Sequence, residues 1–231
     1  MKKLINGIID FRQKSIKEYR SRFANLALRQ SPDTLFIACC DSRVVPNTFA
    51  SSDPGDLLVL RNIGNLVPPY HPNNVIDPSL AAAIEFSLID LKVANIIICG
   101  HSDCGAMHAL IENNETPCSS LPHLNSWLKH AHPSYLRLKN SPCNREENNS
   151  TCNALSKVNV LEQLDNLKTY PLVREHLQKN QLGLHGWWFD LATANVYHYH
   201  HDHKKFTLID EKETEGILAA LKSGGQSPPK T

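Results

Sequence analysis

The chain contains 231 residues, of which 41% are hydrophobic and 20% are charged, and its formal net charge is +1. Such a composition is typical of one globular domain with a buried core. Because a net charge close to zero creates no strong field, nothing favours binding to nucleic acid or to an anionic membrane. No apolar stretch is long enough to span a bilayer, and the apolar start is interrupted at Asn6, Gly7 and Asp10, so we expect no export signal.

The seven cysteines are an odd number in a chain of this length, which does not favour a framework of disulfides. Without an export signal, the expected location is the cytoplasm, where thiols stay reduced. Clustered cysteine and histidine in that compartment indicate metal binding or catalysis.

A helical arm is predicted first, over residues 1–30, because its apolar residues recur at helical spacing. Three nearly continuous apolar runs follow, at 35–40, 56–64 and 94–100. Runs without alternation are typical of parallel strands that are covered on both faces. Between the second and third runs, residues 79–92 predict a helix with Ser79 as its N-cap, so strand, helix and strand form a βαβ unit.

The second half of the chain predicts further helices and then strands. A helix follows Gly105, residues 113–153 mix short helix with loop, and a strong helix stops at Pro171, which can start the next helix. Residues 181–210 are β-rich. We therefore expect an α/β fold with a mostly parallel central sheet, helices on both faces, the N-terminal helical arm and a C-terminal β-rich extension.

Cysteine and histidine stand directly after two of the predicted strands. Cys39 ends the first apolar run, and His101 and Cys104 follow the third, three residues apart. In an open α/β sheet, ligands gather beyond the carboxyl ends of the strands, so the two segments can meet despite the distance along the chain. Two thiolates and one imidazole suit Zn²⁺ and leave one tetrahedral position open, as in catalytic zinc sites. Soft sulfur ligands do not suit Mg²⁺ or Ca²⁺.

Asp41 and Arg43 alternate with Cys39 along the chain, so all three can face the same space. The arginine favours the ionised form of the carboxylate. Such a carboxylate can orient a zinc-bound water by accepting its proton, or it can bind the metal as a fourth ligand; the motif does not choose between the two. Each short motif alone is more often a core cysteine or a capped turn, but their placement after two separate strands favours a metal site.

Taken together, Cys-x-Asp-Ser-Arg and the later His-Ser-x-Cys-Gly resemble the signature of the β-class carbonic anhydrases. The stretch R-N-I-G-N-L-V-P-P at 61–69 is similar to one in plant and many bacterial members, and shorter matches occur at 83–86, 91–93 and 170–174. The resemblance covers about residues 25–192. It implies a catalytic domain at 31–222, and we expect the tail at 223–231 to be disordered.

The resemblance implies that Cys39, His101 and Cys104 bind one Zn²⁺ per subunit and that Asp41 and Arg43 form a catalytic pair. The implied activity is a carbonic anhydrase (EC 4.2.1.1), which reversibly hydrates carbon dioxide to bicarbonate and a proton through zinc-bound hydroxide. The implied assembly is a homodimer or homotetramer in which the arm embraces a second subunit. The residues expected at the substrate are Gln30 as a donor and the apolar Leu58, Val67 and Phe86.

Members of this family have either an open or a closed site. In the closed form the aspartate binds zinc, and bicarbonate can occupy a regulatory pocket built from a tryptophan, an arginine and a tyrosine. The corresponding positions here hold Phe36, Arg61 and Phe189. Because the indole and phenol donors are missing, we expect an open site with water, rather than Asp41, on the zinc.

Other functions remain open at this point. A hydrolase of carbon disulfide or carbonyl sulfide would share the metal motif, a structural zinc or binding module would close the metal with a fourth protein ligand, and a Cys-His hydrolase would use Cys39 or Cys104 as its nucleophile. The sequence H-Y-H-H-D-H at 198–203 could form a second metal site, although a solvated hairpin end is the simpler interpretation.

Overall fold

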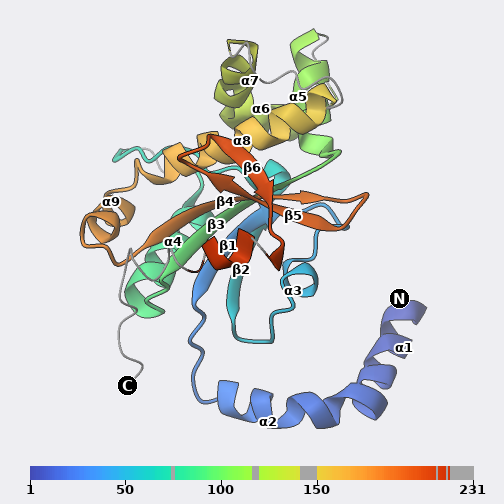
Figure 1. The fold of residues 1–231 in the computed structure, drawn as a ribbon. Helices are drawn as coiled ribbons and strands as arrows, with labels where there is room; N and C mark the ends of the chain where they lie inside the picture. Colours follow the sequence, from blue (N-terminus) through green and yellow to red (C-terminus); the bar gives the residue numbers. More distant parts are fainter. Residues whose placement is uncertain (74–75, 116–119, 141–149, 212, 217, 219–231) are drawn as a thin grey trace.

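The computed structural model describes residues 1–73, 76–115, 120–140, 150–211, 213–216 and 218. Within these ranges one six-stranded sheet lies at the centre, in the order β2-β1-β3-β4-β5-β6 (Figure 1). Its strands are β1 Thr34–Cys39, β2 Leu57–Asn62, β3 Asn95–His101, β4 Gly183–Asp190, β5 Asn195–His200 and β6 Lys205–Leu208. The first four strands in sequence pair in parallel, and β5 and β6 add to the edge in antiparallel fashion. The expected fold class is confirmed, and the three apolar runs are the three strands predicted.

Three helices among the described residues cover one face of the sheet. These are α4 Pro78–Glu85, which continues as a π-helical turn Phe86–Asp90, then α8 Thr151–Leu167 and α9 Pro171–Gln178. Their apolar residues pack with alternate residues of β1 and β3 in one cluster. The N-cap of α4 was predicted wrongly at Ser79. Because Pro78 fits the first helical position, Asp77 is the cap, and its Oδ1 accepts from the backbone N–H groups of Ser79 and Leu80 at 3.0 and 3.1 Å.

A second group of helices lies beyond the carboxyl ends of the strands. It contains α5 Gly105–Glu115, α6 Pro122–Leu128, a 3₁₀ turn Lys129–Ala131 and α7 His132–Lys139, as the upper part of Figure 1 shows. Residues Met107, Leu110, Leu128 and Leu155 form its core together with Cys39 and Cys104. The expected mixture of short helix and loop in this region is confirmed for the described residues. This helical group therefore forms one wall around the two cysteines.

The opposite face of the sheet carries a short helix, α3 Pro46–Phe49. Aromatic rings fill the space between them: the ring of Phe49 stacks on Phe189 at 4.5 Å between centroids and lies 6.1 Å from Phe36. Phe36 and Phe189 are buried. The two faces of the sheet are thus covered unequally within one chain.

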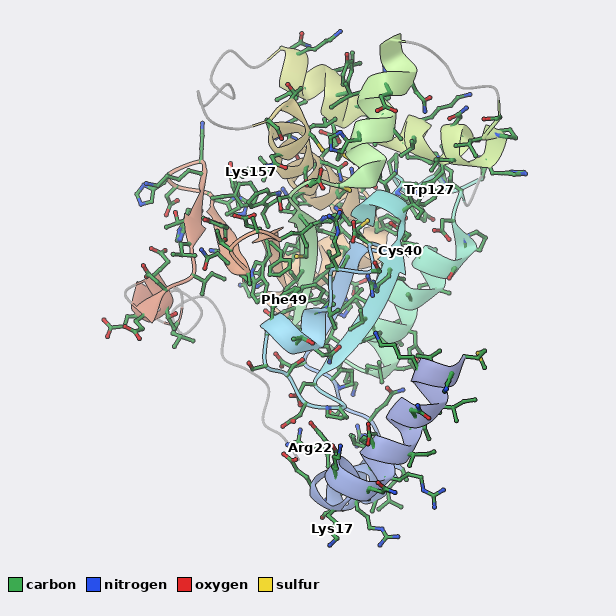
Figure 2. The ribbon with its side chains drawn as sticks, turned by 90° about the vertical axis from the view of Figure 1, so that its right-hand side faces the viewer. Lys17, Arg22, Cys40, Phe49, Trp127 and Lys157 are labelled. Atoms are coloured by element: carbon green, nitrogen blue, oxygen red, sulfur yellow. The ribbon has the colours of Figure 1, made fainter. Side chains whose placement is uncertain are left out.

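The N-terminal arm extends away from this body in Figures 1 and 2. It consists of α1 Lys2–Asp10, a π-helical segment Phe11–Ser15 and α2 Ile16–Leu26, and none of these described residues is buried. Figure 2 labels Lys17 and Arg22 on the arm, below the body that carries Cys40 and Trp127. An ion pair of 2.5 Å between Arg22 and Asp53 joins the arm to the body. The tail at 223–231 lies outside the described residues, and no helix among those described is long and apolar enough to cross a membrane.

Candidate metal centre and its surroundings

The structure brings Cys39, His101 and Cys104 together at the carboxyl edge of the sheet. Cys39 is the last residue of β1 and His101 is the last of β3, and these strands are parallel neighbours, so their ends coincide. Cys104 lies in the turn that leads into α5. One ligand atom of each side chain lies within 4.8 Å of the others, and all three residues are buried. Among the described residues this is the one group of three or more such side chains that could hold a metal ion.

One ring nitrogen of His101 forms a hydrogen bond, and the other has no hydrogen-bond partner. Its Nδ1 lies 2.8 Å from the carbonyl oxygen of Ser102, which can only accept, so Nδ1 carries the proton. Its Nε2 is buried and has no hydrogen-bond partner. A neutral imidazole whose second nitrogen is fixed by a carbonyl is the usual state of a metal-binding histidine. The orphaned Nε2 therefore fits a metal ligand.

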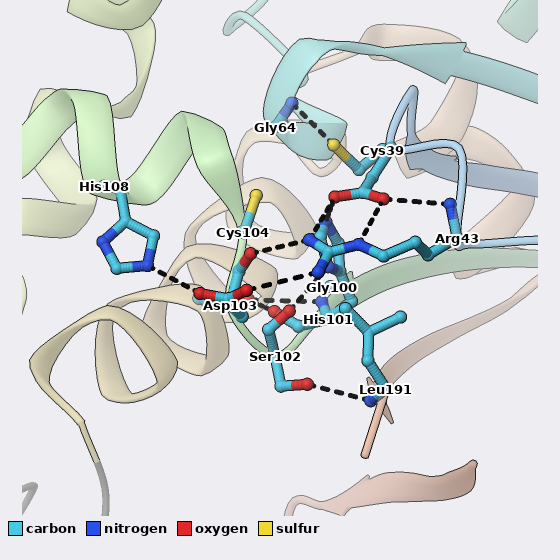
Figure 3. Close-up of polar contacts among 12 residues, drawn as sticks. Cys39, Arg43, Gly64, Gly100, His101, Ser102, Asp103, Cys104, His108 and Leu191 are labelled. Carbon is cyan, nitrogen blue, oxygen red and sulfur yellow. Dashed lines mark hydrogen bonds and ion pairs between the residues drawn. The ribbon is translucent and has the colours of Figure 1, made fainter.

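The thiol of Cys104 donates a hydrogen bond to Cys39, so the two side chains share one proton. The pKa of Cys39 is lowered to about 4, first by the hydrogen bond from Cys104 and against the effect of burial, with further help from His101 and the N–H of Gly64. The same pairing and burial raise the pKa of Cys104. The Gly64 N–H lies 3.4 Å from Cys39 Sγ (Figure 3). A cation at this position would displace the remaining proton and bind two thiolates, as Zn²⁺ does.

Asp41 is held by Arg43 beside this centre. Arg43 Nε donates to Asp41 Oδ1 at 2.9 Å and an NH2 hydrogen donates to Oδ2 at 2.8 Å, while the Arg43 backbone N–H donates to Oδ1 at 3.0 Å. These hydrogen bonds hold the pKa of Asp41 well below its usual range. Asp41 Oδ2 lies 4.0 Å from His101 Nε2. The carboxylate is therefore ionised, bound in bidentate fashion by the arginine, and close to the metal ligands without joining their group.

Two contacts around this pair were not predicted from the sequence, one made by Arg61 and one by Asp103. Arg61 donates to the backbone carbonyls of Cys39 and Asp41 at 2.9 and 2.6 Å, so it fixes the turn that carries the first ligand. Arg43 also reaches Asp103, whose Oδ2 lies 3.2 Å from NH1 and whose backbone carbonyl lies 3.1 Å from NH2 (Figure 3). Asp103 belongs to the other metal-binding segment. The guanidinium of Arg43 thus connects the two loops that carry the ligands.

A polar stripe on the buried face of α8 hydrogen-bonds to the end of β3, which carries His101, and to the loop after β2. The Ser156 hydroxyl donates to the His101 carbonyl at 2.7 Å and accepts from the His101 N–H at 3.2 Å. Asn159 donates to the Gly64 carbonyl at 3.0 Å, and Gln163 accepts from the Val67 N–H at 2.8 Å. These polar residues lie three or four apart on a buried helix face that is otherwise mostly apolar. That interruption was visible in the sequence as Ser156, Asn159 and Gln163, but their partners were not.

The predicted substrate residues are not gathered at the metal centre of a single chain. Gln30 is exposed and precedes β1, so the whole length of that strand, about 16 Å, separates it from Cys39. Leu58 pairs with Leu35 near the start of β2, about 13 Å from the level of Cys39. Phe86 is exposed on the π-helical turn after α4. Val67 is buried in the loop that follows Gly64 and packs against the α4–α8 face.

The histidines at 198–203 form the end of β5 and the following turn, as the simpler interpretation expected. The rings of His198 and His200 lie 5.0 Å apart, and His200 forms an ion pair with Glu213. They do not assemble into a second group of three ligand atoms among the residues that the structure describes.

Fold and site define a class of protein: an α/β sheet with a buried Cys-His-Cys metal centre at the carboxyl ends of its parallel strands. Comparisons with known proteins narrow the class. A family model described as carbonic anhydrase matches residues 34–196. The carbonic anhydrase of Pseudomonas aeruginosa is 39% identical over 85% of this chain and 86% of its own length, and that of Helicobacter pylori is 34% identical over 89% and 93%.

Solved structures agree with the sequence comparisons. The β-carbonic anhydrase CcaA has a TM-score of 0.83 and 36% identity, with 92% of this chain and 93% of that chain covered. A structure described among two tetrameric β-carbonic anhydrases from Sordaria macrospora has a TM-score of 0.71 and 26% identity, covering 84% and 94%. The chain therefore belongs to the carbonic anhydrase family, and to its β class.

Proposed function

We propose that this protein catalyses the reversible hydration of carbon dioxide at Cys39, His101 and Cys104, with Asp41 acting on the reacting water and not on the metal. The zinc site rests on the buried donor set and on the unpartnered Nε2 of His101. When bound there, zinc supplies Lewis-acid chemistry that activates a water molecule towards carbon dioxide at neutral pH. The residues around it supply orientation, charge and the exclusion of bulk solvent.

The role of Asp41 follows from its contacts. Both of its oxygens accept hydrogen bonds from Arg43, so the carboxylate stays ionised and fixed in orientation. Oδ1 accepts two hydrogen bonds, from Nε and from the backbone N–H of Arg43, whereas Oδ2 accepts one. Oδ2 therefore keeps a lone pair that can accept a hydrogen bond from the reacting water and align it for attack on carbon dioxide. To bind the metal, the carboxylate would have to move into the ligand group, which it does not join here, and this movement would strain its bidentate pairing with Arg43. This supports an open site.

The apolar surroundings of Phe36 and Phe189 also support the open site. Both rings are buried against Phe49, and neither carries a hydrogen-bond donor for bicarbonate. Arg61, the third position of the regulatory pocket, is occupied by the carbonyls of Cys39 and Asp41. A regulatory anion would therefore find few donors at these positions.

We further propose that the protein works as a homodimer or homotetramer in the cytoplasm. The arm exposes several large apolar side chains, namely Leu4, Ile5, Ile8, Ile9, Phe11 and Phe23, and a second copy of this chain would bury them. In such an assembly, Gln30, Leu58 and Phe86 of one copy could approach the metal centre of the other copy. The five cysteines among the described residues are free thiols, which suits a reducing compartment.

The variant Asp41→Asn tests the assignment of roles. Zinc content should stay near that of the wild type, while kcat/KM for carbon dioxide hydration in a stopped-flow assay should fall roughly 100-fold, because the amide keeps the shape but not the charge. Asp202→Asn, on the exposed turn after β5, is the matched control and should leave the rate unchanged. Full activity in Asp41→Asn, or a crystal structure near neutral pH with the Asp41 carboxylate on zinc, would overturn the proposed role.

The substrate is tested with the wild-type protein. Zinc-loaded enzyme should hydrate carbon dioxide in the stopped-flow assay, and chelation should abolish the rate. The same preparation is assayed with carbonyl sulfide and carbon disulfide. Turnover of the sulfur compounds without hydration of carbon dioxide would contradict the proposed function.

A further inference from the structure

Asp103 is an unusual residue at its position. Its φ angle is 52°, a left-handed conformation that glycine adopts readily and that most other residues avoid. It lies between the metal ligands His101 and Cys104 and its side chain is 65% exposed. A residue that keeps a side chain where glycine fits the backbone best needs a reason in the contacts of that side chain.

The carboxylate of Asp103 is engaged on both sides. Its Oδ2 accepts from Arg43 NH1 at 3.2 Å, and its Oδ1 accepts from His108 Nε2, on the first turn of α5, at 2.9 Å. Its backbone carbonyl accepts from Arg43 NH2 at 3.1 Å, and its N–H donates to the Asn153 side chain at 2.8 Å. Figure 3 shows Asp103 between Arg43 and His108. The residue is therefore anchored by α5 and α8 and presents its carboxylate to the guanidinium.

Asp103 binds the edge of the Arg43 guanidinium that Asp41 leaves open. The Nε and NH2 groups of the arginine face Asp41, while NH1 and the second hydrogen of NH2 face Asp103. A guanidinium is planar, so binding on both edges fixes its plane, whereas binding on one edge leaves it free to swing with the carboxylate. Since Asp41 takes its orientation from Arg43, whatever fixes the guanidinium also fixes Asp41.

We infer that Asp103 is a positioning residue for the hydration reaction, which acts through Arg43 to hold Asp41 at the angle that the reacting water needs. The inference rests on the proposed function of Asp41. Because the pair with Arg43 is exposed, its contribution to stability is small, and its effect belongs in the rate constant. The carboxylate of Asp103 touches neither the substrate nor the metal.

The test is a double-mutant cycle with Asp103→Gly and Asp41→Asn. Glycine suits the backbone angle and removes the carboxylate, so the loop keeps its shape. In the wild-type background kcat/KM should fall roughly tenfold, since small errors in orientation are costly in the transition state. In the Asp41→Asn background the same change should lower the rate less than twofold, because the group that Asp103 positions is already gone. An equal factor in both backgrounds, or no loss in the single variant, would overturn the inference.

Three further measurements separate positioning from a structural role. Zinc content should remain at one ion per chain in Asp103→Gly; zinc loss in step with activity would show that the residue merely holds the metal loop. Lys92→Gly, another exposed left-handed residue with φ of 54°, is the backbone control and should leave kcat/KM unchanged. Asp103→Asn, which can still accept from Arg43, should recover part of the rate.

A crystal structure of the zinc-loaded Asp103→Gly protein gives a readout independent of activity. Arg43 should leave its present plane, and the Asp41 carboxylate should rotate or spread over more than one orientation. An unchanged Arg43–Asp41 pair would contradict the inference. If the wild-type enzyme fails to hydrate carbon dioxide, the proposed function fails, while the structure of the variant still decides whether Asp103 fixes Arg43.

Discussion

At the carboxyl edge of the sheet, the loops that carry the metal ligands find their partners within the same chain, whereas the arm at Lys2–Leu26 buries none of its described residues. Arg43, Arg61 and Ser156 hydrogen-bond to these loops. Asn159 and Gln163 hold the neighbouring loop after β2, which contains Gly64 and Val67. The arm contacts the body mainly near Arg22 and Leu26. One region is complete by itself, and the other has an apolar surface that a neighbour would cover.

This difference separates two requirements for activity. The metal ligands and the Asp41–Arg43 pair are positioned by strands and by α8, which are the most buried elements of the chain. The expected substrate residues Gln30 and Phe86 are exposed in the single chain, and in the proposed assembly a second copy would have to bring them to the metal. Metal binding should therefore survive changes that abolish assembly, and catalysis should depend on both.

Removing one ligand should break the self-contained region most severely. In Cys104→Ser the hydroxyl replaces a thiolate, so we expect loss of zinc and a fall of the hydration rate to the uncatalysed level. Zinc per chain and stopped-flow rates are measured on the same sample. Cys40→Ser is the control, because Cys40 is exposed next to Cys39 but lies outside the metal group. Retention of zinc and rate in Cys104→Ser would contradict the assigned ligand set.

Deleting the arm, residues 1–26, tests the other region. We expect a smaller particle in analytical ultracentrifugation. Zinc content should be kept, because no residue of the arm belongs to the metal centre. The value of kcat/KM should be clearly reduced, because the expected substrate residues of a second copy would no longer be in place. The milder variant Ile8→Ser/Phe11→Ser keeps the chain length and should shift the assembly equilibrium in the same direction. An unchanged particle mass after deletion would show that the arm has no part in assembly.

Substituting Asn159 weakens the support beneath the site. In Asn159→Ala the carbonyl of Gly64, the hydroxyl of Ser134 and the amide of Gln163 each lose a buried partner, and we expect the free energy of unfolding to fall by about 3 kcal/mol. Urea titrations measure the change. Gln178→Ala, an exposed amide at the end of α9, should cost less than about 0.5 kcal/mol. Equal effects of the two substitutions would mean that the polar stripe carries no special stability.

The smallest effect concerns Tyr170, whose hydroxyl donates to the carbonyl of Pro68 at 2.9 Å. Burial raises the pKa of Tyr170 from 10.0 to about 12. Between these values the unfolded chain loses the phenol proton and the folded chain keeps it, so the stabilisation is complete below pH 10 and is lost as the pH rises towards 12. Tyr170→Phe should lower stability at neutral pH by about 1 kcal/mol and flatten this alkaline decline. A decline of equal slope in both proteins would assign it to other groups.

Local patterns in the sequence predicted the strands and the candidate metal ligands. Continuous apolar runs identified β1, β2 and β3, because strands buried on both faces tolerate few polar residues. Cysteine and histidine at the ends of β1 and β3 identified the metal, because soft ligands are selective. Both patterns involve residues that are close together along the chain, so both can be recognised without the structure.

The pairs of polar groups that form hydrogen bonds between distant segments became known from the folded chain and not from local patterns. Asp103 and Arg43 are 60 residues apart, and Asn159 and Gly64 are 95 apart, so no spacing in the sequence relates them. Asp77, not Ser79, caps α4 because the proline between them fixes the first helical turn. Gln30 and Leu58 lie away from the metal because a strand carries its two ends about 3.3 Å per residue apart. The types of residue indicate which chemistry is possible. The positions of the side chains depend on contacts between distant segments, and those contacts form only when the sheet is assembled.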